Sequence, residues 1–165
     1  MEGRPPPGIV VVGTGNESSG DDGAGLRVAR ALLREPLPPY VSVYEAGMAG
    51  LRLIDLWMGC DLCIVVDAMD AGEPPGTIRE FGGAQAALEC LGGAGTGVSS
   101  HGARLKEALE LGAALGPPYV PGEVRVIGIQ ADPERVRFGT EGLSPEVEAA
   151  CEQVVARIHE LLANL

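Results

Sequence analysis

The feature that most constrains this chain is a short apolar run without alternation, Leu-Cys-Ile-Val-Val at residues 62–66. A strand with one face in water alternates apolar and polar residues, whereas this run is apolar at every position. Its length and its β-branched residues favour a strand over a helix. The run is therefore predicted to be a strand buried on both faces, as in a parallel sheet that helices cover on each side.

Further strands and helices are predicted on both sides of this run. The expected strands are residues 9–12, 41–45, 77–81 and 124–130. Apolar residues recur at helical spacing over residues 23–33, over residues 50–58, in the segment after Ser99-Ser100 and in the C-terminal segment, where Ser144 is expected to cap the helix and Pro145 to begin it. Strands that alternate with helices predict a single α/β domain over residues 1–165, with a mainly parallel, twisted sheet of about five strands and helices on both faces.

Charge and composition exclude several classes of partner. Twelve Lys and Arg stand against 23 Asp and Glu, which gives a net charge of −11. A chain this acidic is a poor match for nucleic acid or for an anionic membrane surface. The longest apolar runs are four or five residues, far below the roughly 20 residues that span a bilayer. The chain is expected to be cytoplasmic, with no nucleic acid and no membrane among its partners.

Two segments are expected to be mobile. Residues 1–7 have no apolar stretch behind their single Arg, so they are predicted to be a disordered leader and not a secretory signal. Residues 92–97 contain four glycines and lead into His101. Because glycine leaves the backbone many conformations, this segment is predicted to be weakly ordered and to close over a bound partner.

The cysteine pattern has two interpretations. Cys60 and Cys63 have the C-x-x-C spacing of a redox site or of half a zinc site. No second C-x-x-C and no H-x-x-x-H completes a metal site, and Cys63 lies inside an apolar run. We therefore predict buried thiols that act as small hydrophobic side chains.

The first glycine-rich loop has chemistry that suits a cation better than a phosphate. Gly13 and Gly15 follow the first strand, as in a dinucleotide-binding loop, but Ser18 stands where that fingerprint needs a third glycine. Asp21 and Asp22 stand where a phosphate site presents bare N–H groups, and two carboxylates would repel an anion. One of them is expected to cap the helix while its neighbour projects outward.

Three side chains are predicted to meet beyond the carboxyl ends of the strands, where ligands bind in open α/β sheets. Asp22 follows the first strand, Asp67 follows the apolar run, and His101 lies in the first turn of a later helix. The positive end of that helix favours a neutral imidazole, the form that binds metal. Two carboxylates and one imidazole suit a divalent first-row metal, and Glu45 is expected beside them.

Each of these residues also has a purely structural interpretation. Asp67 could be tied into backbone amides at the end of its strand, and Asp70 is expected to be a turn residue because Ala71 and Gly72 follow it. His159, the other histidine, is predicted to be a surface or packing residue of the last helix.

These residues also carry a resemblance to a known family, the [NiFe]-hydrogenase maturation endopeptidases, over about residues 8–160. No single motif is specific, but their order and spacing together are. The matching motifs are Val12-Gly13-Thr14-Gly15-Asn16, Gly20-Asp21-Asp22-Gly23-Ala24-Gly25, Glu45-Ala46-Gly47, Ala49-Gly50, Val65-Val66-Asp67-Ala68-Met69-Asp70, Pro75-Gly76-Thr77, Ser99-Ser100-His101, Gly128-Ile129-Gln130 and Leu143-Ser144-Pro145-Glu146-Val147. The chain departs from many relatives at Glu17-Ser18-Ser19, where apolar residues are common.

The resemblance implies an endopeptidase that removes the C-terminal extension of a [NiFe]-hydrogenase large-subunit precursor once nickel is inserted. Nickel would come with the precursor as the recognition element, and the resting enzyme could be metal-free. Residues at the places of Asp22, Asp67 and His101 contact the metal in that family, which makes them the implied metal-binding and catalytic residues. Hydrolysis would use a metal-polarised carbonyl, a metal-activated water or a carboxylate base.

Two other functions remain compatible with the sequence. A hydrolase of another substrate, such as a peptidyl-tRNA hydrolase-like enzyme, could share the scaffold, although a net charge of −11 argues against an RNA substrate. A non-catalytic nickel-binding maturation factor is the second alternative. Nickel carriers usually have a histidine-rich tract, and this chain has only two histidines.

Overall fold

The computed structural model describes residues 8–83 and 100–165, and for residues 100–103 it describes the backbone alone. The predicted leader at residues 1–7 and the glycine-rich segment at residues 92–97 lie outside the described residues. Within the described residues, no helix is both long enough and apolar enough to cross a membrane.

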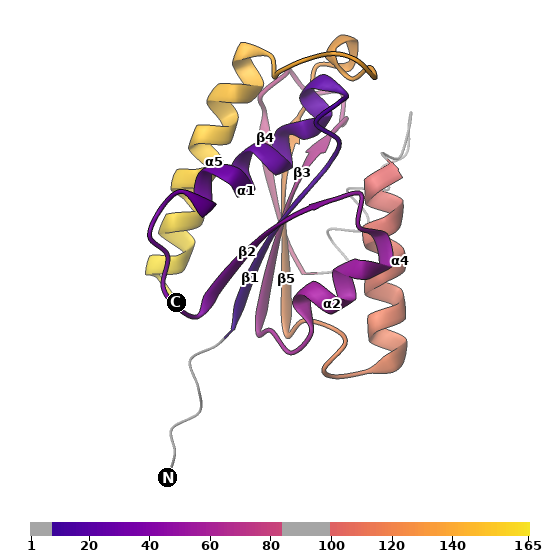
Figure 1. The fold of residues 1–165 in the computed structure, drawn as a ribbon, viewed down its shortest axis with the longest axis vertical. Helices are drawn as coiled ribbons and strands as arrows, with labels where there is room; N and C mark the ends of the chain where they lie inside the picture. Colours follow the sequence, from indigo (N-terminus) through magenta and orange to yellow (C-terminus); the bar gives the residue numbers. More distant parts are fainter. Residues whose placement is uncertain (1–7, 84–99) are drawn as a thin grey trace.

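The described part of the chain contains the predicted strands and helices, in the predicted order (Figure 1). The strands are β1 (Ile9–Thr14), β2 (Val41–Gly47), β3 (Leu62–Met69), β4 (Ile78–Gly82) and β5 (Glu123–Gln130). The α-helices are α1 (Ala24–Leu33), α2 (Leu53–Trp57), α4 (Ser100–Leu115) and α5 (Pro145–Ala163), and the 3-10 turns are η1 (Gly20–Gly23), η2 (Gly50–Arg52) and η3 (Pro133–Arg135).

The five strands form one sheet in the order β2-β1-β3-β5-β4. β1, β2, β3 and β5 run parallel, and β4 pairs antiparallel with β5 at one edge. The prediction of a mainly parallel sheet is confirmed. The unalternating run lies in β3, whose eight residues are all buried, at the centre of the sheet.

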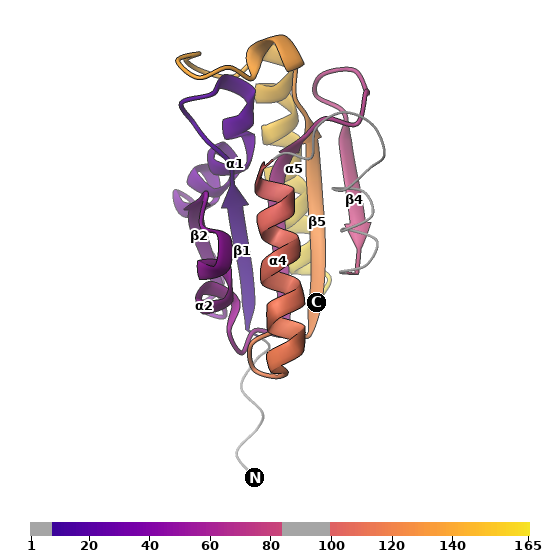
Figure 2. The ribbon, with the colours of Figure 1, turned by 90° about the vertical axis from the view of Figure 1, so that its right-hand side faces the viewer.

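Helices cover both faces of the sheet, and each face has its own apolar core (Figure 2). Alternate residues of β3 divide between them: Ile64 and Val66 pack toward α1 and α5, whereas Cys63 and Val65 pack toward α2 and α4. This alternation explains why the strand is apolar at every position.

Candidate functional site

The order of the strands makes the connections of the neighbouring strands β1 and β3 diverge. From β1 the chain passes through α1 to β2, which lies next to β1 in the sheet. From β2 it passes through α2 to β3, which lies next to β1 on its other side. The helices that make these two connections cover opposite faces of the sheet (Figure 1). Neighbouring strands whose connections diverge in this way form a topological switch point, where open α/β sheets bind their ligands.

Two glycines, one in β1 and one in α1, allow this helix to lie very close to the strands. A Cβ at Gly13 would lie 2.2 Å from the carbonyl oxygen of Gly25. A Cβ at Gly25 would lie 2.3 Å from the carbonyl oxygens of both Thr14 and Val66. These glycines therefore serve close packing of α1 on β1 and β3.

The adjacent carboxylates of η1 have different roles. Asp21 is fully buried, and its carboxylate accepts hydrogen bonds from the backbone N–H of Ser144 at 2.6 Å and from that of Asp132 at 3.0 Å. Asp22 is partly exposed and lies in a turn that contacts the end of β3. The prediction that one of these carboxylates caps α1 is wrong, because neither η1 nor α1 has a side-chain cap hydrogen bond. Asp21 instead binds Ser144, the residue that precedes α5.

The expectation that the Ser144 side chain caps α5 is wrong. Ser144 occupies the N-cap position, but its hydroxyl makes no hydrogen bond to the first turn of its own helix. The hydroxyl instead donates to Asp21 at 2.8 Å. Asp21 thus adds a negative charge at the N-terminus of α5, where Glu146 and Glu148 of the first turn also lie and where the helix dipole is positive.

Asp67 lies inside β3 and not just after it, because the strand continues to Met69. It pairs in register with Gly128 of β5 and shares the sheet face of Cys63 and Val65, toward α4. Its side chain is 2% exposed. A buried carboxylate at the end of a central strand is costly unless partner groups stabilise it, which makes this position informative about function.

His101 lies in the first turn of α4, as predicted. α4 runs antiparallel to β5, which follows it, so the helix begins at the edge where the parallel strands end (Figure 2). Arg104, one turn further on, donates to the carbonyl oxygen of Met48 at 3.0 Å and so holds this end of α4 against the segment after β2. The backbone therefore brings His101 to the same edge as Asp22 and Asp67.

A shared metal site remains a prediction. Among the residues whose side chains the structure describes, no group of three His, Cys, Asp or Glu residues is arranged to hold a metal. The side chain of His101 lies outside that set. The structure shows that the η1 turn, which holds Asp22, contacts β3, which holds Asp67. It also shows that α4 begins at the edge where the parallel strands end, against the segment after β2 (Figure 2).

Glu45 does not join this group in the way we predicted. Along β2, Val41 and Val43 pack toward α1 and α5, and Glu45 continues the same alternation. Its carboxylate is hydrogen-bonded to Arg30 of α1. Glu45 therefore turns to the face opposite that of Asp67.

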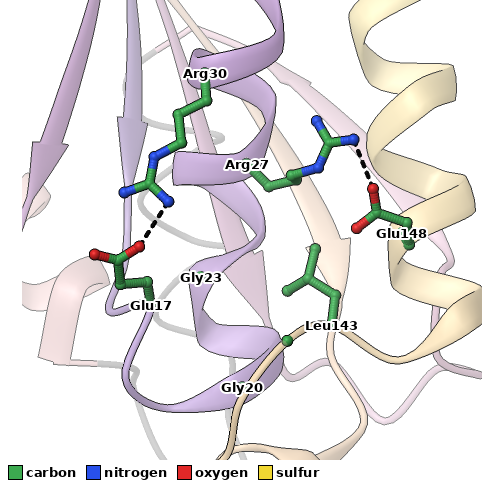
Figure 3. A pocket seen from close by; sticks show the side chains of 8 residues that line it. Glu17, Gly20, Gly23, Arg27, Arg30, Leu143 and Glu148 are labelled. Carbon is green, nitrogen blue, oxygen red and sulfur yellow. Dashed lines mark ion pairs between the residues drawn. The ribbon is translucent and has the colours of Figure 1, made fainter.

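Arg30 links three parts of the structure. Its guanidinium pairs with Glu45 of β2 and, at 2.6 Å, with Glu17 of the first loop (Figure 3). The hydrogen bond and the charge of Arg30 lower the pKa of Glu17, which keeps that carboxylate ionised. A pocket of about 210 Å³ lies beside this pair and also beside Arg27, which forms a 2.6 Å ion pair with Glu148 of α5.

A buried amide fixes the loop that follows β3. Gln130, at the end of β5, is fully buried. Its Oε1 accepts hydrogen bonds from the backbone N–H of Ala71 at 2.8 Å and of Glu73 at 3.4 Å. Its Nε2 donates to Asp70 at 3.3 Å. Asp70 is exposed and also accepts from the N–H of Gly72 at 3.4 Å, so the prediction of a turn residue is confirmed.

The cysteines that the structure describes are buried thiols, as predicted. Cys60, Cys63 and Cys151 form no disulfide. Burial raises the pKa of Cys60 to about 11 and that of Cys151 to about 12, and it raises the pKa of Cys63 as well. Thiols with raised pKa values are poor nucleophiles and poor metal ligands at neutral pH.

The sequence of this chain is similar to those of known proteins. The family model for the hydrogenase maturation protease HycI matches residues 26–161, a range that includes Asp67 and His101. The hydrogenase expression/formation protein HupD of Thiocapsa roseopersicina is 33% identical over 170 aligned residues, which cover 95% of this chain and 74% of that protein.

Solved structures share the fold. The hydrogenase maturating endopeptidase HybD from E. coli has a TM-score of 0.77 and 28% identity, over 93% of each chain. The [NiFe] hydrogenase maturation protease HybD from Thermococcus kodakarensis has a TM-score of 0.77 and 29% identity, over 94% of this chain and 99% of that one. By sequence and by fold, this chain belongs to the hydrogenase maturation protease family.

Proposed function

We propose that this peptidase removes the C-terminal extension of a nickel-loaded [NiFe]-hydrogenase large-subunit precursor, and that it recognises the nickel through Asp22, Asp67 and His101. The observation that carries the proposal is the switch point between β1 and β3. There the turn that holds Asp22 contacts the strand that holds Asp67, and the first turn of α4 brings His101 to the same edge.

The chemistry of these residues supports a metal that arrives with the substrate. A carboxylate that is 2% exposed gains strongly from a divalent cation, because few water molecules screen the two charges. Oxygen and imidazole ligands together suit a first-row metal such as nickel. Asp22 is partly exposed, so the precursor's metal has access to it.

Hydrolysis of the peptide requires that water add to the carbonyl carbon, that the C–N bond break and that the leaving amine take a proton. Asp22 or Asp67 can accept the proton of that water as a general base. The substrate's nickel can instead polarise the carbonyl or activate the water. In both routes the docked metal fixes the scissile bond relative to the two carboxylates.

Membership of a protease family favours this function over the two alternatives. A peptidyl-tRNA hydrolase-like enzyme would have to bind RNA with a net charge of −11. A non-catalytic nickel carrier would not be a peptidase. We further propose that processing takes place in the cytoplasm, because Cys60, Cys63 and Cys151 are free thiols, as is usual in a reducing compartment.

The decisive experiment is incubation of the purified chain with a nickel-loaded hydrogenase large-subunit precursor. We expect the precursor to lose the mass of its C-terminal extension, as measured by mass spectrometry of the intact protein. The same precursor prepared without nickel should remain uncut. Equal cleavage of both forms would disprove recognition through nickel, and cleavage of neither form would disprove the proposed function.

A further inference from the structure

The turn at residues 136–142 is fixed against the first loop by backbone hydrogen bonds. Gly139 donates to the carbonyl oxygen of Ser18 at 2.7 Å, and Gly20 donates to that of Thr140 at 3.0 Å. The two segments approach so closely that a Cβ at Gly20 would lie 2.9 Å from the Thr140 side chain. These hydrogen bonds therefore fix the position of the turn relative to the loop that follows β1.

Hydrogen bonds between residues of the same segment also stabilise the turn. Arg135 donates from Nη2 to the carbonyl oxygens of Glu141 and Gly142, at 3.3 Å each. Thr140 donates from its backbone N–H to the carbonyl oxygen of Arg137 at 3.0 Å. These bonds define the position of the residue that lies between them, Phe138.

Phe138 stands out from this turn with 87% of its surface exposed. It lines an open hollow of about 390 Å³, together with Glu17 and Ser18 of the first loop and Thr140 and Glu141 of its own turn. Single exposed apolar residues are common on protein surfaces. A phenyl ring that a hydrogen-bonded turn holds beside a hollow of this size is, in contrast, arranged to pack against another molecule.

The two charged residues that line the hollow are both acidic. Its charged lining residues are Glu17 and Glu141, whereas Arg137 precedes Phe138 in sequence but does not line the hollow. Glu17 pairs with Arg30, but Arg30 is shared with Glu45, so this group of three keeps a net charge of −1. A ligand that fits must therefore offer an apolar side chain to Phe138 and a cation to the two carboxylates.

We propose that this hollow, bounded by Phe138, Glu17 and Glu141, binds a segment of the precursor polypeptide that carries an apolar side chain next to a Lys or Arg. This inference rests on the proposed function, because it takes the hydrogenase precursor as the occupant. It adds a second docking point, outside the three residues assigned to nickel.

The position of the hollow favours the precursor as its occupant. Glu17 and Ser18 belong to the loop that leads to Asp22, and hydrogen bonds join this loop to the Phe138 turn. Asn16, the neighbour of Glu17, donates from its backbone N–H to the carbonyl oxygen of Asp22 at 3.2 Å, so a polypeptide that contacts Asp22 lies close to the hollow. The hollow and the candidate metal site therefore form one continuous edge.

The test measures the processing rate as a function of precursor concentration, with a nickel-loaded precursor that the unmodified chain trims. Phe138→Ala should raise KM about tenfold and change kcat by less than twofold, because it removes a docking contact remote from the reacting bond. The matched control is Leu33→Ala, which also removes an exposed apolar side chain, here 52% exposed, at the far end of α1. Leu33→Ala should leave both constants unchanged.

A charge reversal tests the second half of the proposal. Glu141→Lys should raise KM about fivefold at low salt, and added salt should reduce that difference because it screens exposed charges. Replacement of Phe138 by a photo-crosslinking phenylalanine should attach the purified precursor through a segment with an apolar residue next to Lys or Arg.

The outcomes separate this inference from the proposed function. If the unmodified chain trims the precursor and Phe138→Ala has the same KM, the docking inference is wrong and the proposed function stands. If the unmodified chain trims no nickel-loaded precursor, both are wrong. Melting temperatures of the variants should match that of the unmodified chain, because neither exposed side chain contributes to either core.

Discussion

Asp21 and Ser144 join the first loop to the last helix through two hydrogen bonds, at 2.6 Å from the Ser144 N–H and at 2.8 Å from its hydroxyl. Asp21 also accepts from the N–H of Asp132 at 3.0 Å. One buried carboxylate thus closes both ends of the segment between β5 and α5. That segment carries the Phe138 turn, so its position depends on Asp21.

We expect Asp21→Ala to destabilise the fold without touching the candidate metal ligands. The variant removes the buried carboxylate that accepts from the Asp132 N–H, the Ser144 N–H and the Ser144 hydroxyl. The loss of these three hydrogen bonds should lower the free energy of unfolding by about 3 kcal/mol. For a chain of this length the melting temperature should fall by roughly 6–12 °C. Thermal unfolding followed by circular dichroism measures this loss.

The control for Asp21→Ala is Asp55→Ala, which removes an exposed carboxylate of α2. Its melting temperature should change by less than about 2 °C, because surface substitutions usually stay within about 0.5 kcal/mol. Equal melting temperatures for Asp21→Ala and the unmodified chain would show that the buried hydrogen bonds of Asp21 contribute nothing to stability.

Local sequence patterns predicted the sheet and its order of elements, because periodicity and turn residues act over a few positions. The apolar run at residues 62–66 was correctly placed in a central strand, and the start of α5 at Pro145 was also correct. The partner of Asp21 could not be predicted in this way. Ser144 lies 123 residues from Asp21 in the sequence, and a pattern of neighbouring residues does not indicate a contact over that separation.

Prediction of the site had the same limit. The strand ends placed Asp22, Asp67 and the start of α4 at one edge, because parallel strands end on the same side of a sheet. The direction of the Glu45 side chain depends on the register of β2 and on Arg30, which lies on another element. A single sequence without contact information indicates neither.

Gln130 is expected to act as a positioning residue for the loop after β3. Gln130→Ala removes acceptors for the N–H groups of Ala71 and Glu73, so their amide hydrogens should exchange faster than in the unmodified chain. Hydrogen exchange measured by NMR reports these two amides directly. Processing should slow, because the loop begins three residues after Asp67.

Gln130→Glu provides the comparison that separates positioning from simple loss of stability. The glutamate keeps an oxygen for the Ala71 and Glu73 amides but loses the donor to Asp70 and to the Ala131 carbonyl oxygen. Protection of the two amides should therefore be partly restored relative to Gln130→Ala. Unchanged exchange in both variants would contradict a positioning role.

The buried thiols should be inert in the folded protein. A pKa of about 11 for Cys60 leaves about 0.1% thiolate at pH 8, about a hundredfold less than a thiol with its ordinary pKa of 9.0. In a Cys90→Ser background, a thiol reagent at pH 8 should therefore modify Cys60, Cys63 and Cys151 only as fast as the chain unfolds. Labelling measured by mass spectrometry against urea concentration checks this.

The same shifts predict how stability depends on pH. The unfolded chain loses its thiol protons near pH 9, whereas folded Cys60 keeps its proton until about pH 11. Between these values the folded state binds more protons, so the free energy of unfolding should fall as pH rises from about 9 toward 11. A Cys60→Ala variant should show a smaller fall over that interval, and an equal fall would contradict the assignment to Cys60.

The two histidines are expected to differ in their importance for processing. His101→Ala and Asp67→Asn should each abolish processing of a nickel-loaded precursor, because each removes one of three proposed ligands and an amide is a much poorer ligand for a divalent cation than a carboxylate.

His159→Ala is the matched control. His159 lies near the C-terminal end of α5, far from the carboxyl ends of the parallel strands. Its imidazole is hydrogen-bonded to Glu35. An exposed pair of this kind contributes at most about 1 kcal/mol, so this variant should process the precursor at the normal rate. Intact mass of the precursor over time, with melting temperatures of all three variants, measures the contrast. Normal trimming by His101→Ala would remove His101 from the site and, with it, the proposed set of three nickel ligands.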